Sequence, residues 1–313
     1  VLEQDPLHAP ALCGLAGLAL GRADWTNART YAEKAARRDP GSADAWYDLG
    51  VALLHLDKPA AAMAAAFKAA LTPDKDPRGF YLAGRAAMVL GDYAEALRLF
   101  DRAYWGNGCD AAARNGRLAA LLAVGNAAEA AQSAQGALEK DPADFTLKAL
   151  YALATDTCDT YAETLARDCG DVPFALQEAA CFLAGMGLYS QGARLLEAAL
   201  RQGLESPLTR YHAAWCLHKA GDAPAAAAHL KQAAALTEVE ALPSRPEELP
   251  MMEYAIAALP GSGRVRLSLG LAYAHFGRLD DAVIQWLGAV EEDPSLGCAW
   301  RLLALHAWKK ENA

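Results

Sequence analysis

The chain has 313 residues, of which 54% are apolar, 21% are charged and 8% are aromatic. This composition excludes a disordered chain, which would be poor in apolar residues, and disfavours an all-β sandwich, which would need more β-branched and aromatic side chains. The net charge of −9 offers no basic surface to nucleic acid or to an anionic membrane, and no uninterrupted apolar run approaches the length of a membrane span.

A repeat with a period of 34 residues runs along the chain. Glycines that suit a turn between two helices lie 34 residues apart at Gly91 and Gly125, and again at Gly187 and Gly221. Asp-Pro pairs, which stop a helix because proline cannot continue the hydrogen-bond ladder, recur at 5–6, 39–40, 141–142 and 293–294. A period of this length predicts paired antiparallel helices that stack on one another.

Two units show the repeat most fully. The first carries Leu269, Gly270, Tyr273, Gly277, Ala282, Trp286, Ala289 and Pro294. The second carries Phe80, Gly84, Gly91, Tyr93, Ala96, Phe100 and Ala103. Both resemble tetratricopeptide repeats position by position, and the resemblance covers nearly the whole chain. It implies an all-α fold, a right-handed α-solenoid of stacked helix-turn-helix hairpins.

Side-chain size along these units agrees with paired helices. Small residues are predicted where two helices must approach closely, at Gly84, Ala96, Gly270 and Ala282. Bulky residues are predicted to fill the gaps, at Phe100, Tyr273 and Trp286. We also expect close helix packing at Gly14, Gly17 and Gly21, and core positions for Trp25, Trp46, Trp286 and Trp300.

The repeat register divides the chain into five regions. They are an N-terminal repeat array at 1–144, a shortened and divergent helical pair at 145–172, repeat units at 173–236, a Pro-containing insertion with an extra helix at 237–262, and a repeat unit with a cut-off first helix at 263–313. Both ends of the sequence fall inside repeats, so we expect it to be a piece of a longer protein.

The last third of the chain resembles one bacterial family more narrowly. The matching segments are 242–248, 253–256, 282–286 and 299–302. In that family, tetratricopeptide units follow an N-terminal β-rich domain that is similar to carbohydrate-active enzymes. The resemblance implies that such a domain would precede this sequence, so it assigns no activity to the repeats.

No group of residues has the sequence spacing of a catalytic or metal site. The seven histidines include no H-E-x-x-H motif, and the seven cysteines include no C-x-x-C pair. His212 with His218, or Cys158 with Cys169, could be combined into a site, but scattered surface histidines and buried cysteines are the simpler interpretation. We therefore predict no enzyme activity, no cofactor and no metal, and reduced thiols favour a cytoplasmic location.

The inner faces of the predicted first helices carry more basic and aromatic residues than a chain of net charge −9 suggests. Arginine binds carboxylates through two parallel hydrogen bonds, and aromatic rings anchor partners at interfaces. The predicted groove residues are Tyr47, His55, Arg78, Tyr81, Arg85, Tyr211, Trp215, His218, Lys219, Arg301 and Trp308. The alternative is that they pair with acidic neighbours inside the repeats and bind nothing.

These patterns predict a non-catalytic scaffold that binds an acidic protein or peptide partner through the concave face of the array. An upstream domain of the same polypeptide would also suit that face, whereas nucleic acid and membranes are not expected as partners. Two other functions stay open. The chain would serve as the accessory C-terminal region of a larger carbohydrate-active enzyme, packed on its catalytic domain, or as a structural module that self-associates through its open ends.

Overall fold

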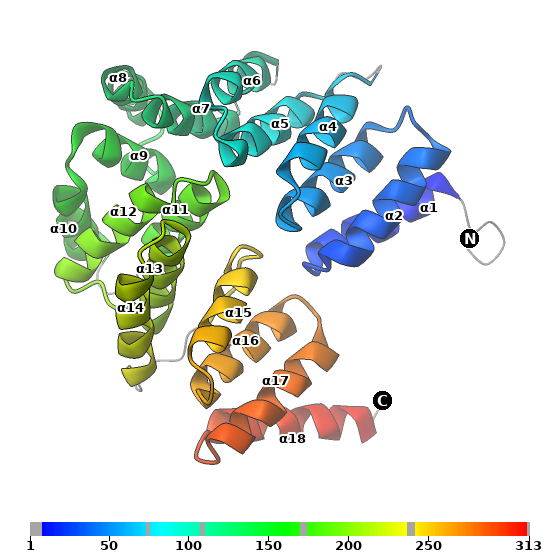
Figure 1. Cartoon of the computed structure of the whole chain (residues 1–313), viewed down its shortest axis with the longest axis vertical. Helices are drawn as coiled ribbons and strands as arrows, with labels where there is room; N and C mark the ends of the chain where they lie inside the picture. Colours follow the sequence, from blue (N-terminus) through cyan, green and yellow to red (C-terminus); the bar gives the residue numbers. More distant parts are fainter. Residues whose placement is uncertain (1–7, 73–75, 107–109, 170–173, 237–241, 312–313) are drawn as a thin grey trace. The chain divides into compact units, whose positions relative to one another are not determined.

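A computed structural model describes residues 8–72, 76–106, 110–169, 174–236 and 242–311. Within these ranges the chain forms eighteen α-helices and no β-strand, which confirms the predicted all-α class (Figure 1). None of the helices in this part of the chain is both long enough and apolar enough to cross a bilayer. The chain divides into two compact units, which are described in turn.

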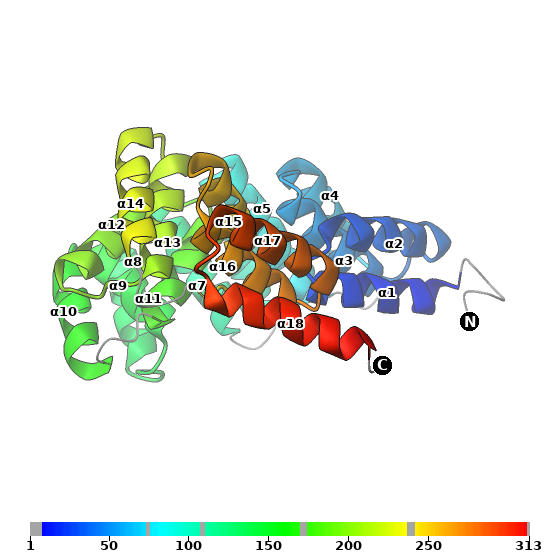
Figure 2. The same cartoon turned by 90° about the horizontal axis from the view of Figure 1, so that it is seen from below.

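Unit 1 comprises Val1–Asp156 and Gly185–Leu188. Its helices are α1 (Ala9–Gly21), α2 (Trp25–Arg38), α3 (Ala43–His55), α4 (Pro59–Ala70), α5 (Pro77–Leu90), α6 (Tyr93–Gly106), α7 (Ala111–Ala123), α8 (Ala127–Leu138) and α9 (Phe145–Thr155). Each odd-numbered helix up to α7 pairs with the next as an antiparallel hairpin (Figures 1 and 2), and the following first helix packs on that hairpin. This is the predicted stacking, although α8 packs less closely on α7 than the other second helices do on their partners.

Unit 2 comprises Thr157–Ala184 and Tyr189–Ala313. Its helices are α10 (Cys158–Cys169), α11 (Phe174–Gly185, of which Gly185 is grouped with unit 1), α12 (Tyr189–Arg201), α13 (Pro207–Lys219), α14 (Ala223–Ala235), α15 (Glu248–Ala258), α16 (Gly263–His275), α17 (Leu279–Glu292) and α18 (Gly297–Glu311). The pairs α13/α14 and α16/α17 are closely packed hairpins, and α18 lies against α17. Helix α15 lies in the predicted insertion and packs on both α13 and α16.

Polar residues start most of these helices, and Asp-Pro ends two of them. Side-chain oxygens of Asp24, Ser42 and Asp144 accept a hydrogen bond from the backbone N–H three residues further on, which satisfies an otherwise unpaired donor of the first turn. Asp39 and Asp293 are the C-terminal caps of α2 and α17, each followed by proline. The predicted role of the Asp-Pro pairs as helix stops is confirmed at these positions.

Left-handed residues close the hairpin turns. The predicted glycines all have positive φ, namely Gly91 (79°), Gly125 (82°), Gly187 (74°), Gly221 (93°) and Gly277 (71°). Ala23, Asp57 and Asp156 take the same conformation where no glycine is present, with φ between 51° and 59°. Such a conformation costs a non-glycine residue roughly 1–2 kcal/mol. Stacking of the two helices therefore enforces the turn even where the sequence disfavours it.

Helix spacing inside the repeats is set by bulky rings that lie against glycine, as predicted. A Cβ atom on Gly84 would lie 2.7 Å from the ring of Phe100, and one on Gly270 would lie 2.4 Å from the ring of Trp286. Real Cβ atoms do not approach neighbours so closely. Gly116 of α7 lies against the same Phe100 ring from the next hairpin. Phe100 is thus enclosed by two glycines and is fully buried.

The expectation for the glycines of α1 is wrong. Gly14, Gly17 and Gly21 are exposed, and a Cβ atom on any of them would meet nothing within 4 Å. Their helical spacing alone did not reveal which face of α1 is buried. The face that packs carries Leu12, Ala16 and Ala19.

The four tryptophans predicted for the core are not equally buried, although Trp46 does pack against buried residues of unit 1. Trp286 is buried as expected, whereas Trp300 is 51% exposed and Trp25 and Trp46 are half-buried. The indole N–H of Trp46 donates to the carbonyl of Pro40 at 2.9 Å, and that of Trp300 donates to the carbonyl of Pro294 at 3.0 Å. The indoles of Trp46 and Trp300 thus hold the turn at an Asp-Pro pair, and they lie at the surface of the repeat.

Gly84→Ala is expected to destabilise unit 1 by about 1–3 kcal/mol, because the added methyl group overlaps the Phe100 ring. Gly17→Ala is the matched control, since its methyl group meets no neighbour and alanine favours a helix by roughly 0.5–1 kcal/mol over glycine. Thermal and urea denaturation measure the difference. Equal effects in the two variants would show that the contact between Gly84 and Phe100 does not set the helix spacing.

Candidate functional site

In unit 1, the predicted groove residues lie on the neighbouring first helices α3 and α5. The guanidinium carbon of Arg78 is 4.8 Å from the centre of the Tyr47 ring. The charge of Arg85 acts on both Tyr47 and His55. Tyr81 is half-buried, and its ring lies 5.8 Å from that of Phe100 on α6, so it belongs in part to the core. The structure therefore brings Tyr47, His55, Arg78 and Arg85 together.

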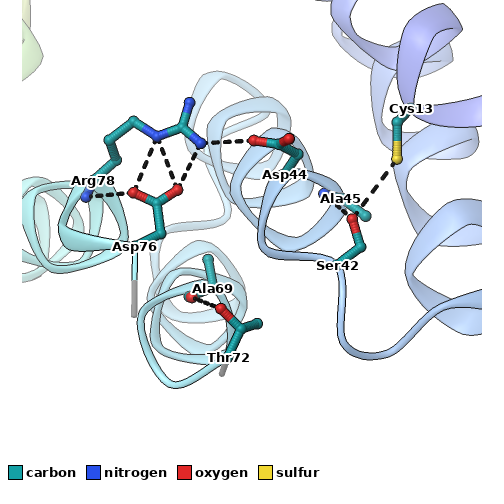
Figure 3. A network of polar contacts seen from close by, with 8 residues as sticks. All are labelled: Cys13, Ser42, Asp44, Ala45, Ala69, Thr72, Asp76 and Arg78. Atoms are coloured by element: carbon teal, nitrogen blue, oxygen red, sulfur yellow. Dashed lines mark hydrogen bonds and ion pairs between the residues drawn. The ribbon is translucent and has the colours of Figure 1, made fainter. Parts of the chain in front are cut away.

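Arg78 is already neutralised within the repeats. Its guanidinium lies 2.6 Å from a carboxylate oxygen of Asp44 and 2.6 Å from one of Asp76, the N-terminal cap of α5 (Figure 3). The hydrogen bond to Asp76, followed by that to Asp44, raises the pKa of Arg78. For this residue the internal pairing that we kept as the alternative is what the structure shows. Arg78 ties α3 to α5 and supports the Tyr47 ring.

Arg85 is in a different position. Among the residues that the structure describes, no carboxylate forms an ion pair with it. Burial and the charge of Arg85 lower the pKa of His55 to about 4, so this imidazole is neutral at pH 7. Burial also raises the pKa of Tyr47, while Arg85 opposes that rise. Arg85 with Tyr47 and His55, here called the Arg85 site, thus combines one cation with two neutral polar groups.

The ring of Trp25 fixes the His55 side of the Arg85 site. The two rings are stacked, with centroids 3.9 Å apart and planes 4° from parallel. Trp25 begins α2 and His55 ends α3, so the stack joins the first two hairpins. A stacked imidazole has little rotational freedom, so the Trp25 ring holds the His55 ring in one orientation.

Asp48 lies beside these residues and was missed in the sequence. It follows Tyr47 on α3, and burial, with the nearby charge of Asp44, raises its pKa to about 6, while Arg78 opposes that rise. The spacing of four between Asp44 and Asp48 was the only available signal, since it places two carboxylates on one face of a helix.

On the neighbouring α1, the thiol of Cys13 is 4.0 Å from the Ser42 hydroxyl (Figure 3), and burial raises the pKa of this thiol.

In unit 2, Trp215, His218 and Lys219 of α13 form a cluster with two tyrosines that the sequence did not indicate. The His218 ring stacks on that of Tyr254 from α15, with centroids 4.0 Å apart. The Trp215 ring lies 5.7 Å from Tyr254. The ammonium group of Lys219 lies 5.1 Å from the Trp215 ring and 5.7 Å from the ring of Tyr189 on α12. We call these five residues the Trp215 cluster.

The other groove residues predicted in unit 2, namely Tyr211, Arg301 and Trp308, lie outside the Trp215 cluster. Tyr211 is 2% exposed and lies in the core of unit 2, so its prediction as an accessible groove residue is wrong. Its position on the helix was correct, but neighbouring elements cover it. Arg301 and Trp308 lie in exposed positions of α18, and Trp308 is 61% exposed. Trp300 and Leu305 are exposed on the same helix.

Unit 1 also contains a cavity of about 800 Å³ between α6, α7 and α8, where α8 packs less closely. Its lining includes Trp105, Arg114, Arg117 and Lys140. Both arginines are paired internally, Arg117 with Asp101 and Glu129, and Arg114 with a carboxylate at the start of α9. The cavity therefore offers less unpaired positive charge than its composition suggests.

Three buried side chains of unit 2 have the composition of a metal site. Cys181 of α11, His212 of α13 and Glu248 of α15 each offer one donor atom, and these atoms all lie within 4.8 Å of one another. His212 is not the surface histidine that the sequence pattern indicated. Glu248 lies 36 residues further along the chain, in the insertion, and only the fold brings the two together.

A family model described as Tetratricopeptide repeat matches residues 3–79, 81–145, 178–244 and 249–296, which is most of the chain. The chain belongs to the tetratricopeptide repeat family. The repeat is a protein-interaction fold that is typically non-catalytic, and its members bind protein partners. No protein with a curated description matches the sequence.

Several solved structures resemble this tetratricopeptide repeat protein. One is a tetratricopeptide repeat protein from Parabacteroides merdae, with 13% identity, a TM-score of 0.42, and coverage of 95% of this chain and 98% of that chain. Another is PilW, a type IV pilus biogenesis factor, with 16% identity, a TM-score of 0.41, and coverage of 74% and 95%. A third is MamA from Desulfovibrio magneticus, residues 41 to the end, with 20% identity, a TM-score of 0.35, and coverage of 62% and 94%.

Asp48→Asn is expected to stabilise the tetratricopeptide repeats of unit 1 at pH 7.5, because it removes a partly buried charge. The gain in the free energy of unfolding should be on the order of 1 kcal/mol, since solvent screens part of the charge on this half-exposed carboxylate. Burial raises the pKa of Asp48 from its usual 3.8 to about 6, so at pH 7.5 folding keeps a disfavoured charge. As the pH falls from 6 towards 4, folded Asp48 takes up a proton and the advantage of asparagine disappears. Melting temperatures at pH 7.5 and pH 4.5 measure this, and the same gain at both values would contradict the assignment.

Proposed function

We propose that this tetratricopeptide repeat protein is a scaffold that binds a carboxylate-bearing segment of a protein partner at the Arg85 site. The observation that carries the proposal is that Arg85 has no carboxylate partner among the described residues, although it lies within an acidic chain. Most other arginines on the inner helices of unit 1 are paired internally. Arg85 is therefore the cation best placed to meet a carboxylate from outside.

The neighbours of Arg85 suit this role. A guanidinium can bind a carboxylate through two parallel hydrogen bonds, and a neutral phenol such as Tyr47 can donate a third. The neutral imidazole of His55 adds a polar group without adding charge, and the Trp25 stack holds it in place. Because α3 and α5 are packed through Gly50 and Leu82, these side chains are held on two rigid helices.

The Trp215 cluster supports a second contact surface in unit 2. Lys219 makes no ion pair with a described carboxylate and lies over two aromatic rings, which leaves its charge available. Stacking of His218 on Tyr254 orders the neighbouring rings. A partner residue with an apolar side chain near an acidic one would suit this combination of flat rings and a cation.

Peptide selection on the full chain tests the Arg85 site. Binders are selected from a library of random peptides with free carboxyl termini, and their affinities are measured by fluorescence polarisation on the wild type, Arg85→Gln and Arg98→Gln. Arg98 is the matched control, since it is exposed on the second helix α6 and pairs with Glu95. Arg85→Gln is expected to weaken binding about 10- to 100-fold, the value of a charged hydrogen bond, while Arg98→Gln leaves it unchanged.

Peptides that lack the acidic group complete a double-mutant cycle, which shows whether Arg85 acts on that group. Amidating the carboxyl terminus, or replacing an acidic side chain by its amide, should weaken binding to the wild type and have no further effect on Arg85→Gln. Equal affinity of wild type and Arg85→Gln for every selected peptide would contradict the proposed site. Loss of binding in both arginine variants would indicate an unspecific charge effect and would contradict it as well.

A further inference from the structure

A buried group of polar side chains in unit 2 joins three helices. Cys181 of α11, His212 of α13 and Glu248 of α15 are 7%, 3% and 0% exposed. The Nε2 atom of His212 is 3.0 Å from Oε1 of Glu248, and the thiol sulfur lies within 4.8 Å of both donor groups. Thiol, imidazole and carboxylate rarely meet in a protein core unless they are paired or bind an ion.

We propose that Cys181, His212 and Glu248 bind one zinc ion, which clamps the insertion helix α15 to α11 and α13.

The donor set selects zinc among the common metals. Sulfur and imidazole nitrogen suit zinc, whereas calcium and magnesium require oxygen ligands. Zinc bonds of about 2.0–2.3 Å in a tetrahedron place two ligand atoms roughly 3.3–3.8 Å apart. The distance of 3.0 Å between Nε2 of His212 and Oε1 of Glu248, and the limit of 4.8 Å on the other separations, bracket these values. Three protein ligands leave the fourth position to a water molecule or another donor.

Glu248 is held as a ligand would be. Its Oε2 atom accepts hydrogen bonds from the backbone N–H groups of Ser244 and Arg245, at 2.7 and 2.8 Å. Burial alone would raise the pKa of this carboxyl, but His212 and those two N–H groups lower it below its usual value. The carboxylate is therefore ionised, and Oε1 is the oxygen directed towards His212. Outer hydrogen bonds of this kind orient metal ligands.

Arg245 is the competitor for this oxygen. Its Nη1 atom donates to Oε1 of Glu248 at 3.3 Å, while its Nη2 atom is buried without a hydrogen-bond partner. Its guanidinium also lies 4.4 Å from the ring of Phe174. Zinc binding at Oε1 replaces the Nη1 hydrogen bond and the direct contact between Oε1 and Nε2 of His212. Arg245→Gln should therefore bind the metal more tightly than the wild type, because a competing cation is removed.

Proton release gives the site a second signature. Burial, more than any nearby charge, raises the pKa of the Cys181 thiol well above its usual value. The ligand is the thiolate, so binding releases this proton. Affinity should thus increase with pH across the neutral range.

Cobalt(II) is the probe for the test. The full chain is stripped with a chelator, freed of it, and titrated with cobalt(II) under reducing conditions, with zinc then added as competitor. The proposal expects one equivalent of cobalt, a near-ultraviolet sulfur-to-cobalt charge-transfer band that zinc abolishes, and a rise in melting temperature with zinc. Circular dichroism checks that the stripped chain and every variant are folded.

Two cysteine variants decide the assignment. Cys181→Ser should lose the charge-transfer band, whereas Cys216→Ser, which alters a buried thiol of α13 outside the trio, should keep it. Glu248→Gln tests the carboxylate, and Arg245→Gln supplies a variant expected to gain affinity. A folded wild type without the band overturns the proposal. A band that persists in Cys181→Ser, or that disappears in Cys216→Ser, overturns it too, because the sulfur ligand would then be another cysteine.

Discussion

The close approach of helices at glycine is the contact on which the rest of the structure depends. Phe100 lies between Gly84 of α5 and Gly116 of α7, so a single ring sets the distance between two hairpins. Gly270 and Trp286 repeat the arrangement in unit 2. With the helix axes fixed in this way, each position of one first helix lies beside the equivalent position of the next first helix. Arg85 is equivalent to Val51 one repeat earlier, and Val51 lies four residues from both Tyr47 and His55. The repeat register therefore places Arg85 next to these two side chains.

The fold could be predicted from the sequence because its determinants are local and recur. Turn glycines, Asp-Pro stops and the small and large residues of the repeat each act within one hairpin or between neighbours. What could not be predicted depends on contacts outside the period. Tyr211 has a groove position in the repeat, yet other elements bury it. Gly17 has helical spacing and faces no neighbour, because spacing does not say which face of α1 is covered.

The candidate site was predicted in composition but not in electrostatics. The basic and aromatic residues of α3 and α5 follow from their inner positions in the repeat. The sequence does not reveal which arginine is available. Arg78 is neutralised partly by Asp44, which lies one repeat earlier, whereas Arg85 pairs with no carboxylate among the described residues. The raised pKa of Asp48 likewise comes from burial between hairpins, which a linear sequence does not report. In an acidic chain, a cation on an inner helix that pairs with no described carboxylate, such as Arg85, is the informative residue.

The insertion before α16 matters because it interrupts the period. A strict repeat would place the first helix of the next hairpin directly after α13 and α14. Instead α15 supplies Glu248 to the buried His212 and, six residues later, Tyr254 to the half-buried ring of Trp215 and the exposed ring of His218. One short helix therefore carries a residue of the buried polar trio and a residue of the surface cluster. Because Glu248 and Tyr254 lie on one helix, whatever holds Glu248 in the buried trio also positions Tyr254 in the Trp215 cluster.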